Sequence, residues 1–104
     1  MKAYVLFGYA RSPGMAGDWH ALAVVRAESI ENAARKFGCA VEDGHGEEGR
    51  FVRQKRQFIG RVVRAMIAAK ALRGRKRRDA LRERKADVLR RYDNFQLRRM
   101  PTLR

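Results

Sequence analysis

The sequence offers few residues that could form cross-links, metal sites or a membrane span. Its 104 residues include a single cysteine, Cys39, so no disulfide can form within the chain. The two histidines, His20 and His45, and the acidic residues near them show no Cys-x-x-Cys or His-x-x-x-His spacing. No apolar run approaches the roughly 18 residues of a transmembrane helix. We therefore expect a cytoplasmic protein without metal, cofactor or membrane contact.

Catalytic motifs are also scarce. Gly8, Gly14 and Gly17 do not have the spacing of a phosphate-binding loop, and a strand pattern follows them where such a loop needs a helix. Cys39 follows the C-terminal end of a predicted helix, and the helix dipole disfavours a thiolate there. No carboxylates cluster near a nucleophile. The sequence therefore favours a binding protein over an enzyme.

What the chain does have is positive charge, and nearly all of it lies in the second half. Residues 1–49 hold 5 Lys/Arg and 7 Asp/Glu, whereas residues 50–104 hold 20 Lys/Arg and 4 Asp/Glu. The two halves, at −2 and +16, give the net charge of +14. Charge of this size attracts anions, and the candidates are nucleic-acid phosphates, an acidic protein surface or an anionic membrane.

The first half has the pattern of a β-hairpin followed by a helix. Residues 3–9 and 19–27 are rich in β-branched and aromatic side chains, and the short loop between them favours antiparallel pairing. Residues 29–38 predict a helix with Ser29 as its N-cap and Gly38 as its stop. We expect its apolar face to lie on one side of the hairpin. The hairpin residues expected to form this core are Val5, Phe7, Leu22 and Val24.

The middle of the chain predicts a loop and a second helix. Residues 42–49 are acidic and glycine-rich, and short strands at residues 40–41 and 51–52 can bracket them. Residues 57–73 follow a helical period, with apolar side chains over about half of the circumference. Gly60 weakens this helix by up to about 1 kcal/mol relative to alanine, and we expect close packing to explain it.

After a break at Gly74, residues 75–95 predict a basic helix that Pro101 cannot continue, and we expect residues 96–104 to fray. The chain as a whole therefore predicts an α+β fold, a small antiparallel sheet packed by two helices. We expect a compact core at residues 1–73 and a basic helical arm at residues 74–104. The arm has one narrow apolar stripe, which consists of Leu81, Val88, Tyr92 and Phe95.

The cations of the arm are the candidate binding residues. On a helix they point in nearly every direction, which suits a phosphate backbone better than a bilayer, because a bilayer requires a broad apolar face. The planar guanidinium group, which predominates here, favours bidentate phosphate contacts. The candidates are Arg73, Arg75, Lys76, Arg77, Arg78, Arg82, Arg84, Lys85, Arg90 and Arg91.

Three functions fit this pattern. The first is a small accessory protein that binds the phosphate backbone of DNA or RNA through the arm. The second is an inhibitor or assembly subunit that docks its apolar stripe on an acidic protein partner, or pairs with a second copy through the same helix. The third is a structural component of a ribonucleoprotein or a phage particle, with the arm folding on assembly.

Overall fold

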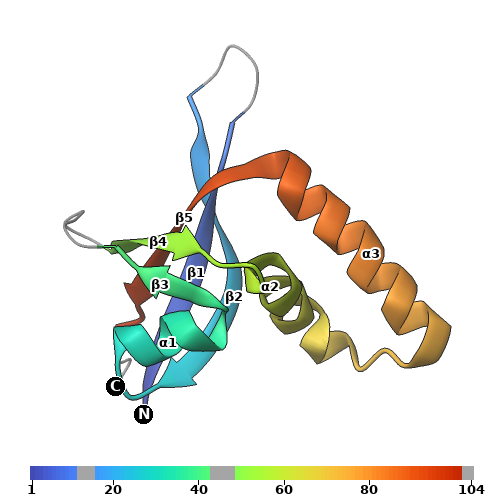
Figure 1. Cartoon of the computed structure of the whole chain (residues 1–104), viewed down its shortest axis with the longest axis horizontal. Coiled ribbons are helices and arrows are strands. Elements are labelled where there is room, and N and C mark those ends of the chain that lie inside the picture. Colours follow the sequence, from blue (N-terminus) through green and yellow to red (C-terminus); the bar gives the residue numbers. More distant parts are fainter. Residues whose placement is uncertain (12–15, 43–48, 102–104) are drawn as a thin grey trace.

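The computed structural model describes residues 1–11, 16–42 and 49–101 and shows an α+β fold (Figure 1). The loops expected at residues 10–18 and 42–49 therefore lie partly outside the described residues, as does the end of the chain beyond residue 101. The elements in chain order are β1 (Lys2–Ala10), β2 (Asp18–Ala27), α1 (Ile30–Lys36), β3 (Cys39–Val41), β4 (Arg50–Gln54), α2 (Phe58–Ile67), the short 3-10 helix η1 (Ala68–Lys70), α3 (Gly74–Arg91) and β5 (Tyr92–Arg99).

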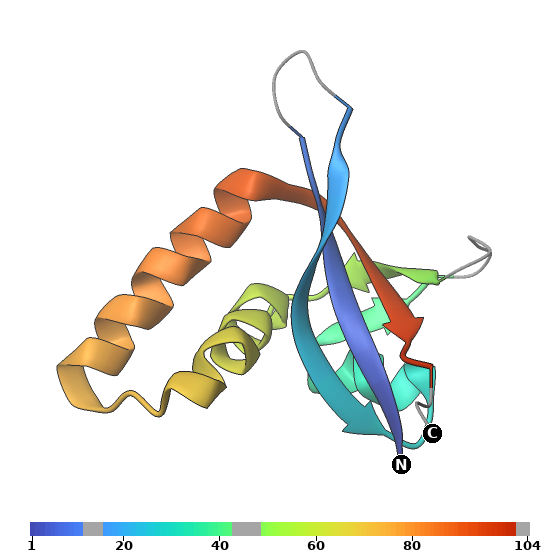
Figure 2. The same cartoon turned by 180° about the vertical axis from the view of Figure 1, so that it is seen from behind.

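The strands form one five-stranded antiparallel sheet in the order β2-β1-β5-β4-β3. The last strand of the chain, β5, therefore lies at the centre, between β1 and β4. The described helices lie on one side of this sheet, and in the view from behind β1 and β2 stand in front with no described helix across them (Figure 2). The sheet thus has a helix-covered face and an open face.

The N-terminal elements form where the sequence predicts them. The β1–β2 hairpin is antiparallel, and the Ser29 hydroxyl oxygen accepts a 3.2 Å hydrogen bond from the backbone N–H of Asn32 at the start of α1. Gly38 follows α1 with φ of +72°, a left-handed conformation that a side chain disfavours. The strands expected around the acidic loop are also present, as β3 and β4.

The expected core residues of the hairpin are largely on the wrong face. The helix-covered core contains Tyr4 and Leu6 of β1 and Ala23 of β2, with Leu22 packed at its margin. Val5, Phe7 and Val24 alternate with these residues and face the open side, where Val5 is buried as expected but Val24 is 56% exposed. Because β1 is apolar at every position from Ala3 to Phe7, its sequence does not mark which alternate set faces the helices.

The helix predicted at residues 57–73 is present as α2 and packs on the core as expected. It is shorter than predicted, because it ends at Ile67. Phe58, Val62, Val63 and Ile67 of α2 are buried against the sheet and α3. Close packing does not explain Gly60, because a Cβ placed there would meet nothing within 4 Å. Gly60 instead leaves open space beside α3.

The largest correction concerns the C-terminus. The helix ends at Arg91 rather than near residue 95, and residues 92–99 form β5 instead of a helix end and a frayed tail. Leu97 pairs with Leu6, and Phe95 pairs with Gly8 on β1. Burial of these side chains in the sheet outweighs the weak helical pattern, so the division into a core at 1–73 and an arm at 74–104 fails over β5.

Candidate nucleic-acid interface

Helix α2 leads away from the sheet and helix α3 returns to it, packed mainly against α2 (Figure 1). The connection from η1 turns through two left-handed residues, Ala71 with φ of +51° and Gly74 with φ of +59°. The two helices then pack side by side, and the chain enters β5 directly after Arg91. This arrangement presents the outward side of α3 to solvent over most of its 18 residues.

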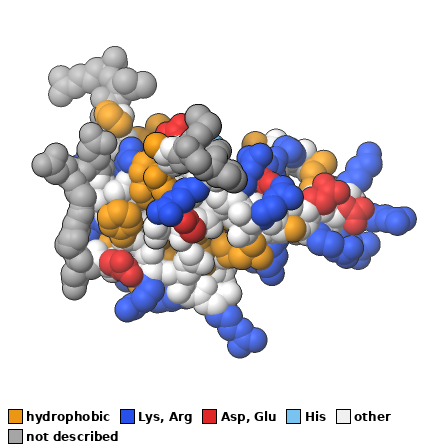
Figure 3. All heavy atoms as spheres, turned by 90° about the horizontal axis from the view of Figure 1, so that it is seen from above, with side chains coloured by type: hydrophobic (Ala, Val, Ile, Leu, Met, Phe, Trp, Pro, Cys, Tyr) orange, Lys and Arg blue, Asp and Glu red, His pale blue; other side chains and the backbone are white. Residues whose placement is uncertain are grey.

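The expected cations of the arm lie at the start of α3 or along it, and all but Arg84 are exposed. Arg75, Arg78, Arg82 and Lys85 follow one another at spacings of three and four residues. With 1.5 Å of rise per residue, they form a row about 15 Å long on one side of the helix. Lys and Arg side chains project from this part of the molecule in the view from above (Figure 3).

Internal ion pairs neutralise only part of this charge. Asp87, the half-buried carboxylate of α3, lies 3.0 Å from a nitrogen of Arg90, 3.6 Å from one of Arg91 and 3.9 Å from one of Arg84. Arg75 lies 4.0 Å from a carboxylate oxygen of Asp79. Within the described residues the other arm cations form no ion pair: Arg73, Lys76, Arg77, Arg78, Arg82 and Lys85.

The start of α3 carries charge of the sign that destabilises a helix. Arg73 is the N-cap and its side chain makes no capping hydrogen bond, and the first turn contains no acidic residue. The backbone N–H groups at a helix start concentrate positive charge, so nearby cations raise the free energy of the helix by a few tenths of a kcal/mol each. A bound anion would offset this cost.

A basic residue of α2 joins the cations of α3. Arg64 lines a hollow of about 290 Å³ between the two helices together with Arg82 and Lys85, and Gly60, Val63 and Leu81 form its apolar floor. The sequence does not indicate Arg64 as a site residue, because its position opposite the apolar arc of α2 predicts exposure but not proximity to α3. Only the packing of the two helices brings these three cations together.

The apolar stripe does not form a partner-binding surface. Val88 is 0% exposed and Phe95 is 3% exposed. The Phe95 ring lies edge-on to the Phe58 ring, with 4.7 Å between their centroids. Leu81 packs at the margin of the same core. Tyr92, which lies in β5 rather than in a helix, contacts His20. The stripe is therefore part of the internal packing of the chain, because α2 and the sheet occupy the side on which a partner helix would dock.

The remaining chemistry is limited. Burial raises the pKa of the Cys39 thiol to about 12, and its Sγ donates a 3.3 Å hydrogen bond to the carbonyl oxygen of Ala34. The thiol is therefore protonated near neutral pH and is a poor nucleophile or metal ligand. Across residues 1–11, 16–42 and 49–101, no group of three or more His, Cys, Asp or Glu side chains gathers as a metal site would require.

None of the described helices has the length and apolar character needed to cross a membrane. Comparisons with protein-family models, curated proteins and solved structures found no match to this chain.

Proposed function

We propose that this protein is a small nucleic-acid-binding protein, not an enzyme, and that it contacts the phosphate backbone through α3. The observation that carries the proposal is the row of exposed cations along α3, of which Arg78, Arg82 and Lys85 lack an ion-pair partner among the described residues. A protein that neutralises phosphates with such residues gains free energy from the release of condensed counterions.

The dimensions of α3 also support the proposal. A helix with its side chains is about 10–12 Å wide, and the major groove of duplex DNA is about 12 Å wide. Helix α3 stands beside the sheet (Figure 1), and the four cations of its row are exposed. The buried free thiol of Cys39 is compatible with a reducing compartment, which supports placing this function in the cytoplasm.

The hollow between α2 and α3 favours a second candidate, a protein partner with an acidic surface. Its apolar floor and its rim of Arg64, Arg82 and Lys85 fit a segment that combines acidic and apolar side chains. Binding of such a segment would depend on Val63 and Leu81 at the floor, whereas phosphate binding along the exposed cation row of α3 would not.

The proposal is tested by removing two charges from the row in the full chain. We expect Arg78→Gln with Arg82→Gln to weaken binding to a random-sequence duplex of 30 base pairs. The matched control is Lys55→Gln with Arg56→Gln, which removes the same charge from two exposed residues of the turn before α2. Fluorescence anisotropy over a salt series gives the affinity and its salt dependence for each variant.

Loss of two phosphate contacts should make the slope of log K against log salt shallower by about 2. The control should keep the slope of the unmodified chain. Equal losses in the two variants would show that only net charge matters, and the proposed location on α3 would then be wrong.

A further inference from the structure

The open face of the sheet carries a cluster of aromatic rings. Phe7 and Tyr9 come from β1, Trp19 from β2 and Phe51 from β4. The Trp19 ring centroid lies 5.1 Å from that of Tyr9 and 6.1 Å from that of Phe51. All four side chains are partly exposed, so the cluster reaches solvent on the side away from the described helices.

Such a cluster is unusual on this kind of surface. When one face of an antiparallel sheet packs on the core, the other face normally alternates to polar side chains. Here the second face holds four of the nine aromatic residues of the chain. The helices already cover the other face, so the internal core does not account for these rings.

The planar guanidinium group of Arg98 lies against two rings of this aromatic cluster. The guanidinium carbon of Arg98 lies 4.5 Å from the Phe7 ring centroid and 5.8 Å from the Trp19 ring centroid. Its Nε donates a 2.7 Å hydrogen bond to Oε1 of Gln96, which fixes the orientation of the guanidinium group. Proteins that bind single strands use both aromatic rings and guanidinium planes to stack unpaired bases.

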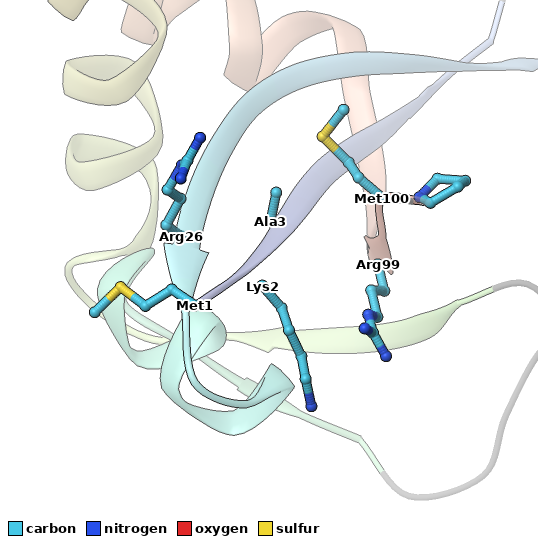
Figure 4. Close-up of a pocket in the computed structure, with 7 residues that line it drawn as sticks. Met1, Lys2, Ala3, Arg26, Arg99 and Met100 are labelled. Carbon is cyan, nitrogen blue, oxygen red and sulfur yellow. The ribbon is translucent and has the colours of Figure 1, made fainter. Parts of the chain in front are cut away.

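Basic side chains continue along the same strands. Lys2, Arg26 and Arg99 line a hollow of about 400 Å³ with Ala3 and Met100 at the end of the sheet. Figure 4 shows Ala3 between Arg26 and Met100, with Lys2 and Arg99 extending in a common direction from neighbouring strands. Ala3 and its partner Arg26 share the open face with Phe7, whereas Lys2 and Arg99 alternate with them and lie on the helix-covered side. Arg26 is therefore the cation of this hollow that lies on the same surface as the rings.

We propose that the open face binds the bases of single-stranded nucleic acid, with Trp19, its neighbouring rings and the Arg98 guanidinium as stacking planes. The phosphates of the same strand would lie toward Arg26, which pairs with Ala3 on this face. The inference depends on the proposed function, because it assigns the type of nucleic acid, but it uses a surface separate from α3. Rings and cations together favour this ligand over an acidic protein, whose carboxylates have no use for the ring faces.

Trp19 is the only tryptophan of the chain and therefore reports on this face directly. The test titrates the full chain with a 12-nucleotide oligouridine, a 12-nucleotide oligothymidine, a 30-base-pair duplex and heparin while following the tryptophan emission. We expect both single strands to quench the emission as bases stack on Trp19. Heparin, which is highly charged but has no bases, should bind without quenching, and the duplex should also leave the emission unchanged.

A pair of charge-conserving variants extends the test. Arg98→Lys retains the charge but loses the planar group, so we expect about a tenfold loss of affinity for the single strands and none for the duplex. Arg99→Lys, on the adjacent residue, is the control and should bind both as the unmodified chain does. The quenching titration requires no substitution and keeps the proposal testable if Arg98→Lys disturbs the sheet.

Four other outcomes would each contradict the proposal. Single strands that bind without quenching, together with normal binding by Arg98→Lys, would overturn the role of the open face and leave the proposed function of α3 intact. Equal quenching by heparin would attribute the signal to charge alone and would also overturn it. Quenching that rises with protein concentration in the absence of ligand would assign the face to a second copy of the chain. Failure of every nucleic acid to bind would reject the proposed function itself.

Discussion

Among single residues, the neighbours Val88 and Leu89 of α3 show that adjacent apolar side chains can differ completely in burial. Val88 is fully buried against α2 and the sheet, whereas the adjacent Leu89 is 60% exposed. The sequence predicts an apolar stripe that includes Val88, and Leu89 is an apolar residue directly beside it. Only the packing of α2 shows which of them stabilises the fold.

We expect Val88→Ala to lower the free energy of unfolding by about 2–3 kcal/mol, because it removes two methyl groups and leaves a cavity. Leu89→Ala should change it by less than about 0.5 kcal/mol. Urea denaturation of the two variants measures both values. Equal effects would contradict the packing described here, and the α3 proposal further predicts that folded Val88→Ala binds duplex DNA normally.

The hairpin shows where residue patterns stop being informative. The boundaries of β1 and β2 follow from their composition, but the choice of core face does not, because both faces of β1 carry large apolar residues. The residue pattern therefore predicts Val5 and Phe7 on the helix-covered face and assigns no role to Trp19. A strand that is apolar on both faces indicates that its second face either binds a partner or is covered by another segment.

At the scale of elements, α1, α2 and the hairpin could be predicted because their signals are local: a capping serine, a helical apolar period and β-rich runs. Strand β5 could not, because Tyr92 and Phe95 continue the spacing of Leu81 and Val88. What makes residues 92–99 a strand is pairing with β1 and β4, which lie far away in sequence. The cations of α3 could be listed from sequence, but their grouping with Arg64 depends on how α2 and α3 pack.

Helix α2 provides a prediction of its own. Gly60→Ala should stabilise the protein by about 0.5–1 kcal/mol, because alanine is the better helix former and the added Cβ would meet no atom within 4 Å. The control is Gly38→Ala, which should destabilise it, because Gly38 has φ of +72° and a Cβ would lie 3.1 Å from the carbonyl carbon of Gln57. Thermal melts of both variants measure the shifts. Destabilisation by Gly60→Ala would place an unrecognised contact at that site.

At the scale of the whole molecule, the basic helix is an insertion between two parts of one sheet rather than an appended arm. Helix α3 is held at its start by the turn after η1 and at its end by β5, the central strand. The excess positive charge of the chain therefore lies on a segment between β4 and β5. The sheet is complete only when β5, which follows α3, has paired with β1 and β4.

This topology predicts that a chain ending at Gly74 does not fold. Such a chain lacks the strand between β1 and β4 and leaves Leu6 and Phe58 without Leu97 and Phe95. We expect circular dichroism to show no cooperative thermal transition, whereas a control chain ending at Pro101 should melt cooperatively. A cooperative transition in the shorter chain would contradict the central place of β5.

The salt dependence of duplex binding by the unmodified full chain shows most directly whether α3 binds the nucleic-acid backbone. Neutralisation of about six phosphates predicts a slope of log K against log salt near −5. A slope flatter than about −2 would mean that too few phosphates are contacted, and backbone binding along α3 would then be wrong.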